Sequence, residues 1–457
     1  MENYDVDLPD LKDLTTINSF GLGFLLLVSI LIVFLPRRSA IVAMILTICY
    51  CTLGQRIAIA NLDFTILRIL IALGWIRLIV RRELFRFRLN AIDKAIVLWV
   101  ISSVTIYTLL WQTWGALIYR LGFTYNILGS YFLFRYLIRD LDDIYRVIKI
   151  LVIVIIPLAV SMWIEKATGR NLFSIFGGVP EFSVLREGKV RCQGPFEVSI
   201  LAGTFGATSI PLLVALWFRG EGMRLIAIAG IISAPVITLT SSSSGPAAAF
   251  VCGIVGLCMW RFRKRMRIIR WGILFSLIAL HVIMKAPVWY LMDRVSGLLG
   301  GSGFYRSYLL DQAIKHFNEW WLIGTKYTAH WTYSTLLSEP NKADITSQYI
   351  GEAVNGGLLT LILFVTIISL CFRALGQLLG EMEEQPFPLR LTLWSIGTAL
   401  FVHVVSFFSI SYFDQMMEIW TLLLAVISTT SGSRAKWKVD WSQVPGPAHS
   451  EVKALNN

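Results

Sequence analysis

Charged residues are scarce in this chain of 457 residues: they make up 15% of it, whereas they make up about a quarter of an average soluble protein. Apolar residues account for 56% of the chain, and the mean hydropathy is +0.67. These values exclude an ordinary soluble protein and indicate a polytopic membrane protein. The net charge of +12 does not indicate a nucleic-acid partner, because the basic residues stand in short runs between apolar segments.

Several catalytic and metal-binding motifs are also missing. There are six cysteines and no CxxC pair, so neither a disulfide framework nor a cysteine zinc site is expected. No Walker loop, dinucleotide fingerprint, HExxH or GxSxG motif occurs. These absences argue against nucleotide-driven transport and serine-hydrolase chemistry. The first apolar run, 20–35, follows an acidic tail and has no small-residue cleavage site, so we interpret it as a retained span.

Long apolar segments are what the chain does have. A membrane span needs about 20 mostly apolar residues. We therefore predict an all-α fold: a polytopic membrane helix bundle of about 12–13 transmembrane helices with one large extracytoplasmic loop. The expected spans are 19–36, 39–53, 64–80, 91–111, 121–138, 147–164, 198–218, 225–240, 245–260, 268–284, 349–372, 390–411 and 416–429. The second and last are short enough to be re-entrant.

Basic residues orient this bundle. Arginines and lysines gather in alternate connections, the strongest run being R-F-R-K-R-M-R at 261–267, and we place these connections in the cytoplasm. The expected domains are an N-terminal tail at 1–18, a bundle at 19–284 with an outside loop at 165–197, a large extracytoplasmic loop at 285–347, C-terminal spans at 348–429 and a disordered cytoplasmic tail at 430–457. Within the large loop, helical spacing predicts a helix over 304–318.

The two long outside segments carry candidate functional residues. Arg191 stands in R-C-Q-G-P-F-E just before a span, where its guanidinium can pair with a lipid phosphate or simply extend to the membrane surface. Arg294 and Arg306 flank a glycine-rich turn that suits a diphosphate, although both can be ordinary surface charges. Possible general bases include His316, His330, Asp344 and Glu352. Histidines and carboxylates within spans, namely His281, His403, Asp414 and Glu418, are further candidates.

The order of four segments resembles the O-antigen ligase and polymerase superfamily of bacterial membrane glycosyltransferases. These segments are R-C-Q-G-P-F at 191–196, S-S-S-S-G-P at 241–246, Arg306 with L-I-G at 322–324, and D-I-T-S-Q-Y-I-G-E-A-V-N-G-G-L-L at 344–359. Ligases of this family usually carry a histidine where this chain has Thr346 and Ser347. That departure favours a polymerase over a ligase.

The resemblance implies an enzyme of surface polysaccharide assembly, such as exopolysaccharide synthesis at the cell envelope, in the bacterial inner membrane. Its donor would be a polyprenyl-diphosphate-linked glycan. Its partners would be the lipid bilayer and other polysaccharide-assembly proteins. The reaction would need neither a metal nor a cofactor. The expected roles are diphosphate binding by Arg191, Arg294 and Arg306, general base catalysis by Asp344 or His330, and sugar stacking by Trp320, Trp331 and Tyr333. Two alternatives stay open: a transporter or flippase of lipid-linked glycan, and a non-catalytic subunit of an export system.

Overall fold

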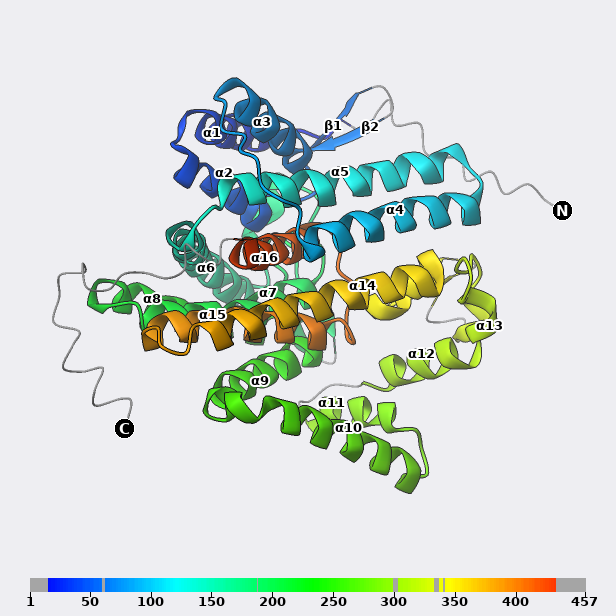
Figure 1. Ribbon diagram of the computed structural model, residues 1–457. Helices are drawn as coiled ribbons and strands as arrows, with labels where there is room; N and C mark the ends of the chain where they lie inside the picture. The colour runs from blue at the N-terminus through cyan, green and yellow to red at the C-terminus, as the bar shows by residue number, and fades with distance from the viewer. Residues whose placement is uncertain are drawn as a thin grey trace.

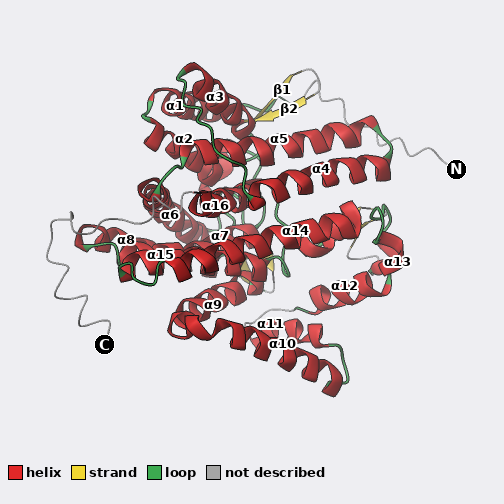
Figure 2. Cartoon of the chain, in the orientation of Figure 1, coloured by secondary structure: helices red, strands yellow, loops and turns green. Residues whose placement is uncertain are grey.

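The computed structural model of the chain describes residues 15–59, 62–186, 188–298, 303–332, 337–339 and 342–432. Helices dominate it (Figure 2), and its described strands form three short β-hairpins. The acidic tail through residue 14, Tyr333 and the tail from residue 433 lie outside the described residues.

Each expected span is a helix, and the predicted all-α class is confirmed for the described residues. Asparagine and threonine side chains cap several helices: Asn18 accepts from the Gly21 amide, and Asn90 forms a capping box with Asp93. The helices are α1 (Ser19–Phe34), α2 (Arg37–Tyr50), α3 (Ile66–Val80), α4 (Ala91–Trp111), α5 (Trp114–Leu137), α6 (Leu141–Thr168), α7 (Ser199–Trp217), α8 (Glu221–Thr240), α9 (Ser244–Cys258), α10 (Met266–Ile283), α14 (Gln348–Glu381), α15 (Phe387–Ser406) and α16 (Asp414–Gly432).

Seven helical stretches of the described chain are long and apolar enough to cross a membrane. The remaining described helices are too short or not apolar enough, and α1, with 16 residues, is apolar but short. The chain is therefore compatible with a multi-pass membrane protein, whereas the higher number of about 12–13 spans stays a prediction. The seven stretches are Ala91–Trp111, Leu141–Thr168, Ser199–Trp217, Gly222–Thr240, Ser244–Ile283, Gln348–Glu381 and Phe387–Ser406.

Helix α7 lies inside the bundle and is the most buried of these seven stretches. Small residues let its neighbours approach closely: a Cβ on Gly203 would lie 2.3 Å from the Ser241 hydroxyl, and one on Gly206 would lie 2.6 Å from the Ala234 carbonyl oxygen. Helix α10, in contrast, has no buried residue and lies at the edge of the bundle (Figure 1).

The connections separate into two ends of the bundle, as the alternation of basic runs predicts. At the basic end, ion pairs join neighbouring connections, including Arg37–Asp143 at 2.8 Å and Arg219–Asp142 at 3.0 Å. At the opposite end, Asn18 bonds to the Ile175 carbonyl at 2.6 Å. The α4–α5 connection and α12–α13 lie at this opposite end, toward the right of Figure 1. The predicted sorting of connections is therefore reproduced, while the assignment of the opposite end to the outside stays a prediction.

The segment predicted as a large loop contains its own helices in its described part. They are η4 (Val288–Tyr290), α11 (Leu291–Leu298), α12 (Phe304–Lys315), α13 (Phe317–Trp320) and η5 (Ala329–Trp331), followed by the hairpin of β5 (Leu337–Glu339) and β6 (Lys342–Ala343). The helix predicted over 304–318 is thus present, but it breaks at His316 into α12 and α13.

A kink in α14 joins this segment to the bundle. Gly357 has a non-helical backbone, with φ of 65° and ψ of −172°. The Leu358 amide donates to the Trp321 carbonyl at 2.8 Å, and the Thr325 amide donates to the Val354 carbonyl at 2.9 Å. These two bonds replace the bond that the amide of residue 358 would make to the carbonyl of residue 354 in a regular helix. The kink therefore holds the residues after α13 against α14.

Candidate functional site

Arg191 and Arg306 come together at the end opposite the basic connections. Arg191 ends β4 (Lys189–Arg191), which pairs with β3 (Val184–Arg186). Its guanidinium donates to the Ser243 hydroxyl at 2.8 Å. Ser243 belongs to the four-serine turn between α8 and α9, hereafter the serine turn (Ser241–Ser244). The turn is tied to the hairpin by Lys166, whose ammonium donates to Ser242 at 2.8 Å and to the Val190 carbonyl at 2.6 Å.

Buried Glu165 fixes the backbone that follows Arg191. Its carboxylate accepts hydrogen bonds from the amides of Gln193 at 3.0 Å and Gly194 at 2.9 Å, and from the Ser183 hydroxyl at 2.8 Å. Gly194 has φ of 55°, a backbone conformation that favours glycine. This network positions the guanidinium of Arg191 without touching it.

Arg306 reaches the same place from α12. Its Nε donates to the Ser409 carbonyl at 3.2 Å, and its Nη1 is buried with no hydrogen-bond partner among the described residues. Gly245, two residues after Ser243, makes room here, because a Cβ there would lie 2.8 Å from the Ser409 hydroxyl and 3.7 Å from Nη2 of Arg306. The glycine of the S-S-S-S-G-P segment therefore lets the arginine of a distant helix approach the serine turn.

Among the described residues, the charged side chains that shift the pKa of Arg306 are both arginines. Burial lowers the pKa of Arg306, and the neighbouring guanidiniums of Arg191 and Arg186 lower it further. We call these three residues the arginine cluster. An arginine keeps its charge at neutral pH, so like charges meet here in a partly buried place. An anion bound between them would relieve this repulsion, and phosphate oxygens match the guanidinium geometry.

Asp344 contacts the residue that precedes Arg306. The Tyr305 hydroxyl donates to the Asp344 carbonyl at 2.8 Å, and Tyr305 directly precedes Arg306. The side chain of Asp344 is exposed, yet the surrounding protein removes enough hydration to raise the pKa of its carboxyl. A carboxylate with a raised pKa is a stronger base, which suits the role predicted for it.

A polar cavity of about 680 Å³ lies beside this site. Ile345 and Ser411 line it, and the Ser411 hydroxyl donates to the Ile345 carbonyl at 2.8 Å. Ser411 is two residues from the Ser409 carbonyl that Arg306 binds, so the same chain segments border the cavity and the arginine cluster. The volume falls within the range of small-molecule sites. Its charged lining residues are Arg56, Asp63, Arg68, Arg120, Glu197, Glu352, Asp414 and Glu418.

Polar contacts hold several of these cavity residues in place. Glu352 accepts from the Trp99 indole at 2.9 Å and from the Gln348 amide at 2.8 Å. The guanidinium of Arg120 lies 4.0 Å from the centre of the Tyr107 ring. Arg68 donates to the Asn126 side chain at 3.1 Å. These contacts therefore fix the polar lining of a cavity within the bundle.

Sequence reasoning singled out Glu352, Asp414 and Glu418 but missed Arg68 and Arg120. Their position in the sequence could have identified these arginines, because each stands within or beside an apolar segment, and a charge at membrane depth is a functional candidate. The sequence does not show which carboxylates share a cavity with them.

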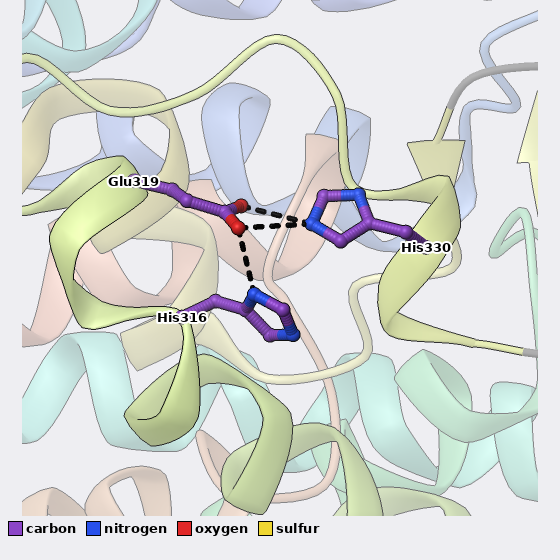
Figure 3. A group of neighbouring side chains, drawn as sticks. All are labelled: His316, Glu319 and His330. Atoms are coloured by element: carbon purple, nitrogen blue, oxygen red, sulfur yellow. Dashed lines mark hydrogen bonds and ion pairs between the residues drawn. The ribbon is translucent and has the colours of Figure 1, made fainter.

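The other predicted site residues that the structure describes have surroundings of their own. Arg294 is exposed on α11. Trp320 and Trp331 are buried in a small core with Leu309 and Ile350, so neither ring offers an open face to a sugar in this arrangement. Tyr333 lies outside the described residues. His330 is exposed and pairs with Glu319 at 3.0 Å (Figure 3).

In comparisons with known proteins, no protein-family model matches the chain, and no curated protein sequence matches it.

Proposed function

We propose that this chain is an integral membrane glycosyltransferase of surface polysaccharide assembly. It transfers or polymerises glycan from a polyprenyl-diphosphate-linked donor on the extracytoplasmic face of the bacterial inner membrane, with polymerisation favoured over ligation. The observation that supports this proposal most strongly is the close approach of Arg191 and Arg306 at the serine turn. These residues come from segments more than a hundred positions apart, and both belong to the motifs that resemble the family.

In the proposed reaction, a hydroxyl oxygen of the acceptor glycan bonds to the anomeric carbon of the donor sugar. The bond from that carbon to the diphosphate oxygen breaks, and the polyprenyl diphosphate leaves with the electron pair. Asp344 accepts the proton of the acceptor hydroxyl. Arg191 and Arg306 stabilise the charge that develops on the leaving diphosphate, and their partial burial strengthens this effect. No nucleotide or metal enters the step.

The buried Nη1 of Arg306 supports this assignment. This guanidinium nitrogen is buried without a partner among the described residues, which costs free energy that a bound phosphate oxygen would recover. The polar cavity supports it as well, because its volume can accommodate sugar units beside the diphosphate.

Transport of a lipid-linked glycan is the second candidate, and the polar cavity is the observation that favours it. Buried Glu352 and Glu418 line that cavity within helices of the bundle, and intramembrane carboxylates often mark transport pathways. A transporter would use the same arginines for the diphosphate but would need no general base.

The deciding experiment uses the full chain purified in nanodiscs with a polyprenyl-diphosphate-linked oligosaccharide. A glycosyltransferase releases polyprenyl diphosphate and forms longer glycan, whereas a transporter leaves the donor intact. Arg191→Ala and Arg306→Ala each remove charge-assisted hydrogen bonds worth about 1.5–3 kcal/mol, so turnover should fall by at least about 10- to 150-fold. Arg170→Ala is the matched control, because Arg170 is exposed at the same end and pairs with Glu181.

The same variants are then returned to a strain that lacks the chain, and the surface glycan is sized. Loss of chain length identifies a polymerase, and loss of attachment identifies a ligase. Normal glycan and unchanged turnover with both arginine variants would refute the assignment of the arginine cluster.

A further inference from the structure

A second group of side chains meets at the same end of the molecule, outside the arginine cluster and the polar cavity. His316 follows the last residue of α12, Glu319 stands in α13, and His330 stands in η5. Nδ1 of His316 lies 2.7 Å from one oxygen of Glu319. Nε2 of His330 lies 3.1 and 3.0 Å from the two oxygens. Figure 3 shows both imidazoles directing a nitrogen at the carboxylate between them.

The three donors are held by a packed support. Trp320 and Trp331, the neighbours of Glu319 and His330, are buried in the small core of this segment. The Trp331 indole donates to Glu319 at 3.2 Å, and its ring stacks on the ring of His316 at 5.7 Å. The Trp320 indole donates to the Ala313 carbonyl at 2.7 Å. The donors are therefore brought together by folding and do not depend on an exposed loop finding its place.

The donor group is open to solvent. The side chains of His316, Glu319 and His330 remain 29%, 36% and 48% exposed, so an ion can enter from solvent and keep a water ligand.

We propose that His316, Glu319 and His330 form a binding site for a divalent transition metal, with Zn²⁺ as the ion. Two imidazoles and one carboxylate make a common zinc donor set, with bonds of about 2.0–2.2 Å. Ligands at that distance around a tetrahedral ion lie about 3.3 Å apart. All donor atoms here lie within 4.8 Å of one another. Small side-chain movements therefore open the group around an ion that replaces the hydrogen-bonding protons.

The ion would tie the end of α12 and α13 to η5. These segments are separated by the turn at Gly324, which has φ of 83°. Arg306 stands near the other end of α12, so the ion would stabilise the helix that carries an arginine of the cluster. This role is structural and distinct from the proposed transfer chemistry, in which no metal takes part.

The test measures Zn²⁺ binding to the full chain in nanodiscs after chelator treatment, purified without a polyhistidine tag. Titration calorimetry at neutral pH should give one site per chain. Co²⁺ should add the visible absorption bands of a low-symmetry site with nitrogen and oxygen ligands. His316→Ala and Glu319→Gln should each weaken binding by at least about 100-fold, since loss of a second-shell partner already costs 10- to 100-fold.

His281→Ala is the matched control, because His281 is the exposed histidine at the end of α10 and lies outside the group. It should bind Zn²⁺ like the original chain. Glu319→Gln preserves shape, and a monodisperse elution profile establishes that it is folded. Absence of stoichiometric Zn²⁺ binding by the original chain would overturn the proposal. Binding that survives both substitutions would overturn it too, because the ion would then lie elsewhere.

Discussion

Gly324 is the residue on which the joint between the α11–η5 segment and the kink of α14 depends. Its φ is 83°, and a Cβ there would lie 2.1 Å from the Val354 carbonyl oxygen. That oxygen accepts the amide hydrogen bond of Thr325 at 2.9 Å. Gly324→Ala must therefore both strain the backbone and displace a carbonyl that holds the joint together.

The two effects can be given magnitudes. A side chain in the left-handed region costs about 1–2 kcal/mol, and forcing extra volume into a packed place costs about 1–3 kcal/mol. Their sum, about 2–5 kcal/mol, should reduce the free energy of opening the joint by that amount. Because each 1.36 kcal/mol corresponds to a factor of ten, hydrogen exchange at the joint should accelerate by at least about 30-fold.

The assay is hydrogen–deuterium exchange of the full chain in nanodiscs, read at the amides of Thr325 and Leu358, which make the two bonds across the joint. Gly351→Ala is the control. Gly351 lies in α14 with ordinary helical geometry, and the nearest atom to its Cβ position is 3.5 Å away. Exchange at both amides that is equal in Gly324→Ala and Gly351→Ala would refute the reasoning.

Three further predictions concern the base, the cavity and the orientation. If Asp344 is the base, turnover should be lost as the pH falls through its raised pKa, at a higher pH than for a free aspartate. A pH–rate profile checks this. Asp344→Asn should be inactive at every pH, and an active variant would exclude the role. Trp99→Phe leaves the Glu352 carboxylate without an indole donor and should lower thermal stability in detergent by about 1–3 kcal/mol; an unchanged melting temperature would contradict the hydrogen bond. A cysteine at exposed Tyr327 should react with a membrane-impermeant maleimide on intact spheroplasts, whereas one at Arg265 should not, in a background without other reactive cysteines; the reverse pattern would invert the predicted topology.

The positions of the helices follow from the sequence because they depend on local properties. Apolar run length and the basic residues between the runs placed the start of α4 and α7 within a residue or two. Residues such as Asn90 begin a helix through hydrogen bonds within a few positions of themselves. The sorting of connections into two ends follows from the same alternation.

The candidate site followed from the sequence only in part. Arg191 and Arg306 stood out as single arginines in distinctive segments, and their meeting could be proposed but not located. The tryptophans show the limit most plainly: Trp331 reads as an exposed aromatic in a polar segment, yet it is fully buried. Whether an aromatic side chain packs or faces solvent depends on what folds over it, and nothing local to Trp331 specifies that.

By itself, then, the sequence determined that this is a helical chain suited to a membrane, where its helices lie and which residues carry unusual charge. Only the tertiary structure decided that the arginine cluster forms at the serine turn, that Arg68 and Arg120 share a cavity with buried carboxylates, and that His330 meets Glu319. The physical reason is that each of these groups joins residues from different elements. Such contacts depend on how the helices pack against each other. Glycines that permit close approach, such as Gly245 against Ser409, decide that packing.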